Sequence, residues 1–123
     1  MYIDEWATWI GQVNRDNGWR DRYKDLVDAA DDEGIRDHLL AKLALIDSEV
    51  AEAMEIIRTD DLATFNQVTV VNGKQEGIPT ELADIIIRTL DLAGMLGIDN
   101  LMSVMVEKVT YNSKRGYKHG KKA

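Results

Sequence analysis

Apolar side chains recur at steps of three and four residues over most of the 123-residue chain, and its only proline is Pro79. This spacing places apolar side chains on one face of an α-helix, whereas a half-buried strand would alternate apolar and polar positions. We therefore predict an all-α fold built from about four main helices.

The N-terminal half contains two of the predicted main helices. The first begins after Asp4 and ends near Asn17 and Gly18, an Asn-Gly pair typical of a helix C-terminus. Residues 21–30 are predicted to add one or two further helical turns. The second main helix covers residues 35–58. The predicted core positions of these two helices are Trp6, Trp9, Ile10 and Val13 in the first, and Leu39, Leu43, Ile46, Val50, Ala53 and Ile57 in the second.

Helical periodicity is absent from residues 59–78. The sequence VTVVNGK predicts either a small hairpin around Asn72 and Gly73 or a loop that closes over a site. An irregular segment of this length is unusual in a small domain, so it is a candidate lid.

Two more helices are predicted in the C-terminal half. Pro79 fits the first position of a helix that continues to about Leu96 and ends at Gly97. Asp99 is a suitable N-cap for the last helix, which runs to about Ser113.

Composition and charge restrict the class of protein. The length fits a single domain over residues 1–123, and no run of apolar residues is long enough for a membrane span. The N-terminal residues lack the pattern of a signal peptide and cysteine is absent, so we expect a cytoplasmic protein without disulfides. The net charge of -7 argues against binding a nucleic-acid polymer. The basic residues between 108 and 122 could still bind a small anion, or form a solvated tail.

A narrow polar strip follows the helix predicted over residues 79–96. Its members are Glu81, Asp84, Arg88 and Asp91. They lie within an arc of about 80° on a helical projection. The other positions of this helix are mostly apolar, so we expect it to be buried nearly all round. Charges on a buried helix cost several kcal/mol each unless they are paired or bound to a metal.

The helix over residues 35–58 supplies possible partners for this strip. Glu49 and Glu52 lie beside Leu45 and Ile56, away from the polar side of that helix. An ExxE spacing also occurs on ordinary helix surfaces, but here it is matched by ExxD on a second helix. Carboxylates without histidine or cysteine favour Mg²⁺, with Mn²⁺ as a substitute. The sequence thus predicts a magnesium site that works on a phosphorylated small molecule.

Three residues on one face of the last predicted helix could bind the phosphates. They are Lys108, Asn112 and Arg115, at positions i, i+4 and i+7. Arg88 of the polar strip is a further candidate for phosphate or sugar. Alternatively, Lys108 pairs with a surface acid. Trp19 lies outside the apolar face of the first helix.

Three sequence blocks, taken together, resemble the MazG-like all-α nucleoside triphosphate pyrophosphohydrolases, a superfamily that includes dCTP pyrophosphatases and dimeric dUTPases. The blocks are LALIDSEVAEAMEIIR, EGIPTELADIIIRTLDLAGMLGID and EKVTYNSKRGYKHG. The resemblance covers residues 39–120, with a weaker match in NGW at residues 17–19. The family motif is EExxE followed by ExxD, and Ser48 stands here in place of the first glutamate.

The resemblance implies a MazG-like helical bundle completed by homo-oligomerisation, as a dimer or a pair of dimers. It also implies Mg²⁺-dependent cleavage of a nucleoside triphosphate to the monophosphate and pyrophosphate, which controls or cleans the nucleotide pool. It assigns the metal ligands and catalytic carboxylates to Glu49, Glu52, Glu81 and Asp84, one of which orients the attacking water. Lys108 and Asn112 match the family's contacts to phosphate and sugar. The base of the implied nucleotide needs a pocket, and Trp19, outside the apolar face of the first helix, is predicted as its wall.

Two alternatives remain open at this point. In the first, the chain is a non-catalytic interaction module whose acids form salt bridges across a homodimer seam; this needs a basic partner for each acid, and the strip itself contains only Arg88. In the second, the protein is a hydrolase for dUTP or for modified nucleotides. An aromatic residue occupies the position of Arg88 in the dCTP-specific branch, which weakens a dCTP assignment. The base, and ribose or deoxyribose, stay open.

Overall fold

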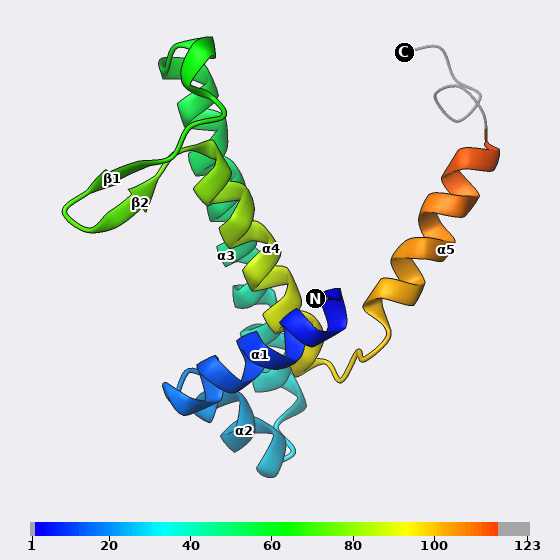
Figure 1. The fold of residues 1–123 in the computed structure, drawn as a ribbon. Helices are drawn as coiled ribbons and strands as arrows, with labels where there is room; N and C mark the ends of the chain where they lie inside the picture. Colours follow the sequence, from blue (N-terminus) through cyan, green and yellow to red (C-terminus); the bar gives the residue numbers. More distant parts are fainter. Residues whose placement is uncertain (1, 116–123) are drawn as a thin grey trace.

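The computed structural model describes residues 2–115, which form five α-helices, one short 3-10 helix and one β-hairpin (Figure 1). The mostly helical fold is confirmed, and the hairpin is the exception to the all-α prediction. The elements are α1 (Ile3–Asp16), α2 (Asp21–Asp28), α3 (Asp32–Thr59), η1 (Leu62–Thr64), β1 (Thr69–Val71), β2 (Lys74–Glu76), α4 (Ile78–Met95) and α5 (Leu101–Lys114).

Helices α3 and α4 lie side by side and run in opposite directions (Figure 1). Helix α1 crosses the C-terminal half of α4, and α2 packs against α3 near the start of that helix. The small core between α1 and α4 contains Ala7, Ile10 and Leu90, with Ile3 and Leu101 packed against it. Helix α5 contacts α1 and extends away from the α3–α4 pair (Figure 1).

The hairpin predicted around Asn72 and Gly73 is confirmed. Strands β1 and β2 are antiparallel, with Val71 opposite Lys74. Asn72 and Gly73 have φ angles of 52° and 79°. Positive φ at both central residues suits a two-residue hairpin turn, and glycine and asparagine adopt it at little cost. The hairpin leads directly into α4, whose second residue is Pro79.

The end of α4 follows a pattern common at helix C-termini. Gly97 has φ 72°. The amide of Ile98 donates to the carbonyl of Ala93 at 2.9 Å, and the amide of Gly97 donates to the carbonyl of Gly94 at 3.1 Å. These hydrogen bonds satisfy carbonyls that the helix itself leaves without partners. They also set the direction in which the chain leaves towards α5.

The prediction that this helix is buried nearly all round is wrong for the single chain. Leu82, Ile86 and Ile87 on α4 are 51%, 57% and 43% exposed. Helices α3 and α1 cover only part of the α4 circumference, and α5 does not pack on the remainder. Trp6 and Trp9, predicted as core, are 41% and 53% exposed.

Of the residues predicted as core on α1, Ile10 is confirmed. Ala7, Ile10 and Gly11 are buried there, whereas Val13 is 41% exposed. The small residues Ala7 and Gly11 allow α1 to lie close against α4.

The row of α3 that faces α4 also differs from the predicted stripe. It consists of Lys42, Ile46, Glu49, Ala53 and Ile56, all buried or half-buried. Steps of four and three residues connect these positions, so they share one face of the helix. Ile46 and Ala53 belong to the predicted stripe and are confirmed, whereas Leu43, Val50 and Ile57 are 49%, 39% and 55% exposed. The prediction considered only apolar residues and therefore did not include Lys42 and Glu49 in the row.

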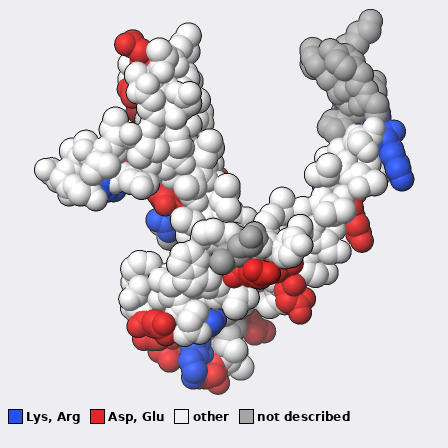
Figure 2. Space-filling view, viewed as in Figure 1, with Lys and Arg blue, Asp and Glu red and all other residues white. Residues whose placement is uncertain are grey.

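Large apolar areas stay open to solvent. Within residues 2–115 no side chain is completely buried. Figure 2 shows broad uncharged surfaces along α5 and along the upper part of α3 and α4. None of the helices within these residues combines the length and apolar character that crossing a membrane requires.

Candidate metal centre

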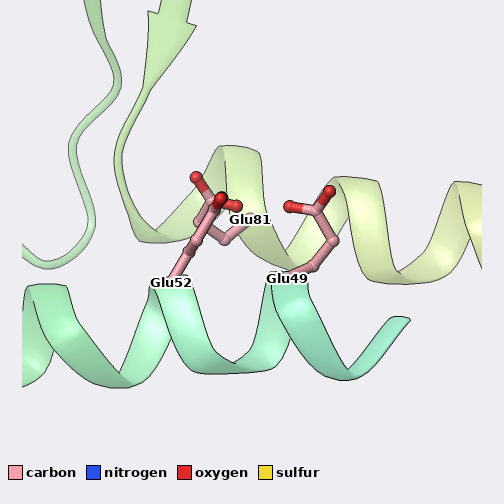
Figure 3. A group of neighbouring side chains, drawn as sticks. All are labelled: Glu49, Glu52 and Glu81. Carbon is pink, nitrogen blue, oxygen red and sulfur yellow. The ribbon is translucent and has the colours of Figure 1, made fainter. Parts of the chain in front are cut away.

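Three glutamates from two helices converge beside the start of α4. Glu49 and Glu52 lie one turn apart on α3, and Glu81 lies in the first turn of α4 (Figure 3). One carboxylate oxygen from each lies within 4.8 Å of the others. Glu49 and Glu81 are 8% and 7% exposed, whereas Glu52 is open to solvent. The antiparallel packing of α3 and α4 brings the predicted ExxE and ExxD segments together.

The electrostatics of this cluster are unfavourable for ionised acids. Burial, followed by the contacts with Glu49 and Glu52, raises the pKa of Glu81 to about 8. Glu81 Oε2 is buried and has no hydrogen-bond partner. The pKa of Glu49 is lowered, first by hydrogen bonding with Glu81 and then by Arg88, against the effect of burial.

Asp84 lies one helical turn beyond Glu81 and borders the three-glutamate group. It is half-buried, and the pKa of its carboxyl is raised by burial and by the negative charge of Glu49. Arg88 lies one turn further and donates from Nε to Glu49 Oε1 at 3.0 Å. Within residues 2–115 this is the salt bridge that reaches the cluster, so most of its negative charge lacks a cation.

The residues present fit a divalent metal. All the donors are carboxylate oxygens, which Mg²⁺ and Mn²⁺ prefer. A buried oxygen without a partner, next to other carboxylates, marks a position where a cation would be stabilised. Exposed acidic clusters are common without metal. Here, however, two of the three glutamates are buried.

A pocket of about 400 Å³ borders Asp84 and Arg88 beside the three-glutamate group. We call it the Trp19 pocket, and its lining residues are Asn14, Trp19, Lys42, Asp84, Ile87, Arg88 and Asp91. The structure thus places the predicted base-pocket residue Trp19 in one pocket with Asp84 and Arg88. Sequence reasoning missed Asn14 and Lys42. The available signal for Lys42 was its position four residues before Ile46 and seven before Glu49.

The last acid of the polar strip has a different partner. Asp91 Oδ1 accepts hydrogen bonds from Arg20 Nη2 at 2.6 Å and from Arg20 Nε at 3.1 Å. Arg20 Nη2 also donates to the carbonyl oxygen of Asp91 at 3.2 Å. Asp91 therefore carries its own counter-charge and does not belong to the metal centre.

The predicted phosphate-binding residues of α5 are not brought to the carboxylates within this chain. Helix α5 extends away from them (Figure 1). Lys108 Nζ and the Arg115 guanidinium lie 5.2 and 5.3 Å from the centre of the Tyr111 ring. The Asn112 Oδ1 atom is buried without a hydrogen-bond partner. The remaining basic residues, from 116 to 122, lie outside the described residues.

Comparison with known proteins adds no assignment. No family model, no curated protein and no solved structure matches the chain. The resemblance to MazG-like pyrophosphohydrolases therefore stays a prediction.

Proposed function

We propose that this protein is a Mg²⁺-dependent nucleoside triphosphate pyrophosphohydrolase of the MazG-like type. The main support is the buried Glu81 carboxylate, which has an unpartnered oxygen and two other glutamates as neighbours. Such a group is stabilised by a divalent cation. The resemblance of the three sequence blocks supplies the reaction, because carboxylate geometry alone is compatible with several phosphate chemistries.

In this proposal Glu49, Glu52, Glu81 and Asp84 hold the metal, and Mn²⁺ can substitute for Mg²⁺. When bound, Mg²⁺ polarises phosphoryl oxygens and orients the triphosphate. One of the four carboxylates orients the attacking water as a general base. The Nε contact of Arg88 fixes the position of the Glu49 side chain, and its guanidinium offers further donors to phosphate or sugar.

We also propose that the active form is a homodimer or a pair of dimers. Exposed apolar side chains on α5, among them Val106 and Val109 at 57% and 65%, have no cover within residues 2–115. Association of copies through these surfaces would bury them. In such an assembly Lys108, Asn112 and Arg115 of one copy bind the triphosphate held at the carboxylates of another. This would reconcile their predicted role with their distant position in the single chain.

The proposal is tested by pyrophosphate release from each ribo- and deoxyribonucleoside triphosphate with Mg²⁺. We expect release from at least one of them. Glu52→Gln should reduce the rate by at least about 100-fold, because changes to residues that only support metal ligands already cost 10–100-fold. Glu55→Gln is the matched control, since Glu55 lies on the same helix but is exposed and next to Arg58.

Two results of the nucleotide assay, and one of the variant comparison, would contradict the proposal. One is the absence of pyrophosphate with every nucleotide. The other is release of inorganic phosphate instead, which would leave the metal centre but replace the reaction. Equal activity of Glu52→Gln and Glu55→Gln would remove the carboxylate cluster from the mechanism.

A further inference from the structure

The Trp19 pocket has the size and walls of a site for a flat ring. Its volume of about 400 Å³ lies in the range of small-molecule sites. Trp19 contributes an indole that is 65% exposed in the absence of a ligand, and Ile87 contributes an aliphatic surface that is 43% exposed. Aromatic rings stack favourably on such surfaces. Since Asp84 belongs to both the pocket and the carboxylate region, a ring bound here lies next to the proposed metal centre.

Three charged groups of this pocket have a partner or a proposed role elsewhere. Asp91 Oδ1 accepts two hydrogen bonds from Arg20. Arg88 Nε donates to Glu49, and the other nitrogens of its guanidinium are the donors proposed above for phosphate or sugar. Asp84 belongs to the proposed metal site. In the proposed complex these three groups are therefore directed to Arg20, to phosphate or sugar and to the metal rather than to a base.

The Lys42 ammonium and the Asn14 amide are further polar groups of this pocket that are available to a ligand. Neither makes a side-chain hydrogen bond or a salt bridge within residues 2–115. Lys42 is half-buried on the row of α3 that faces α4. Asn14 is also half-buried, and its backbone carbonyl accepts a hydrogen bond from the amide of Trp19 at 2.9 Å. The two polar groups and the indole thus border one space.

The chemistry of these groups differs in a way that selects a ligand. An ammonium has three donors and no acceptor, whereas an amide has both donors and an acceptor. Asn14 can therefore adapt to either edge of a base, but Lys42 can bind only an acceptor. A carbonyl oxygen on the base satisfies Lys42, as when lysine binds the O6 atom of guanine. An exocyclic amino group at the same place would set donor against donor.

We infer that the Trp19 pocket binds the nucleobase and selects bases with an oxo group, at C6 of a purine or C4 of a pyrimidine, over those with an amino group. This inference rests on the proposed function and specifies its substrate class. Lys42 and Asn14 are its specificity-determining residues. The favoured substrates are the triphosphates of uracil, thymine, guanine and hypoxanthine.

Two pairs of substrates isolate the exocyclic group. Inosine and adenosine triphosphates differ at C6 and the neighbouring N1 proton, and uridine and cytidine triphosphates differ likewise at C4 and N3. We expect kcat/KM to favour the oxo member of each pair by about 10-fold or more, the scale of one hydrogen bond to a charged group. Lys42→Met should bring both ratios to within about 2-fold, and Lys42→Arg should retain the preference. Lys24→Met is the control, because Lys24 lies on α2 and pairs with Asp28.

The outcomes separate this inference from the proposed function. If no nucleotide is cleaved, the proposed function fails. The base preference of the pocket is then tested by measuring the dissociation constants of UMP and CMP by calorimetry, which requires no catalysis. Tighter binding of UMP than of CMP supports the inference. If cleavage occurs with ratios near one, or with the amino member favoured, the inference is overturned. It is equally overturned if Lys42→Met lowers all rates and leaves the ratios unchanged. If Lys42→Met does not fold, the kcat/KM ratios of the wild-type protein for the two substrate pairs still test the inference.

Discussion

Helix α4 presents two buried acids on one polar strip, and their surroundings are opposite. Glu81 and Asp91 are 7% and 9% exposed. Asp91 is bound by the Arg20 guanidinium, with the shortest contact at 2.6 Å. Glu81 has Glu49 and Glu52 as neighbours and one oxygen without a partner. Burial of a carboxylate is therefore a poor indicator of function by itself. The indicator is whether the fold supplies the counter-charge.

Near the C-terminal end of α4, the packing of α1 and α4 leaves space for the Arg20 guanidinium beside Asp91. A Cβ atom placed at Gly11 or at Gly94 would lie 3.0 Å from Arg20 Nη2. Absence of a side chain at both positions leaves room for the guanidinium between α1 and α4. The Glu81 end has no comparable basic side chain in the described chain, and we propose that a metal ion has this role.

The largest expected effect comes from breaking the Arg20–Asp91 pair. Arg20→Met leaves a buried carboxylate without a cation, which typically costs about 3–5 kcal/mol of unfolding free energy. The double change Arg20→Met with Asp91→Leu should recover most of this loss, because it removes the charge as well. Urea denaturation measures both. A loss below about 1 kcal/mol for Arg20→Met would show that the pair is not a structural element.

Replacing Glu81 should raise the free energy of unfolding of the metal-free protein, whereas replacing Arg20 should lower it. The folded pKa of Glu81, about 8, lies above the ordinary 4.5. The stability linked to its proton is therefore complete below pH 4.5 and is lost as the pH rises to 8. Glu81→Gln should stabilise the metal-free protein at pH 8.5 by roughly 2–4 kcal/mol, and much less at pH 5. Equal denaturation midpoints for Glu81→Gln and wild type at pH 8.5 would contradict the raised pKa.

The effect of Mg²⁺ on Tm should also differ between a change at Glu81 and a change at the Arg20–Asp91 pair. At 100 times its dissociation constant, Mg²⁺ stabilises a protein that binds it only when folded by about 2.7 kcal/mol. Wild type and Arg20→Met should both show the corresponding rise in Tm, whereas Glu81→Gln should not. Thermal denaturation with and without Mg²⁺ measures the difference. A rise that persists in Glu81→Gln would place the metal elsewhere.

The smallest effect is expected where an ion pair is short but exposed. Lys24 Nζ lies 2.7 Å from Asp28 Oδ2, and the two side chains are 74% and 61% exposed. Solvent screens such a pair, so its geometry contributes little to stability. Lys24→Met should leave Tm unchanged within error. A clear decrease would mean that distance, rather than burial, determines the contribution of ion pairs in this chain.

Local features of this fold were predictable from the sequence. Helical period alone placed Glu81 and Asp84 on one strip, and Asn72-Gly73 identified the hairpin turn. The convergence of Glu49 and Glu52 with Glu81 was expected because acids on a mostly apolar helix need a partner. The antiparallel packing of α3 and α4 brings these residues together.

Other features depend on tertiary contacts that periodicity does not contain. Arg20 lies 71 residues from Asp91 and outside any apolar stripe, so their pairing had no sequence signal. The direction of α5 depends on the geometry after Gly97, and this decides whether Lys108 approaches the carboxylates. The hydrolytic reaction rests on the resemblance and on its proposed test.

The incomplete burial of the single chain has a consequence for its thermodynamics. No side chain within residues 2–115 is completely buried. In the proposed homodimer or pair of dimers, a second copy would therefore contribute part of the driving force for folding. Folding and association then form one equilibrium governed by mass action. The midpoint of thermal unfolding would rise with protein concentration, and dilution alone would unfold the chain. The stability of the chain then depends on its own concentration as well as on its sequence.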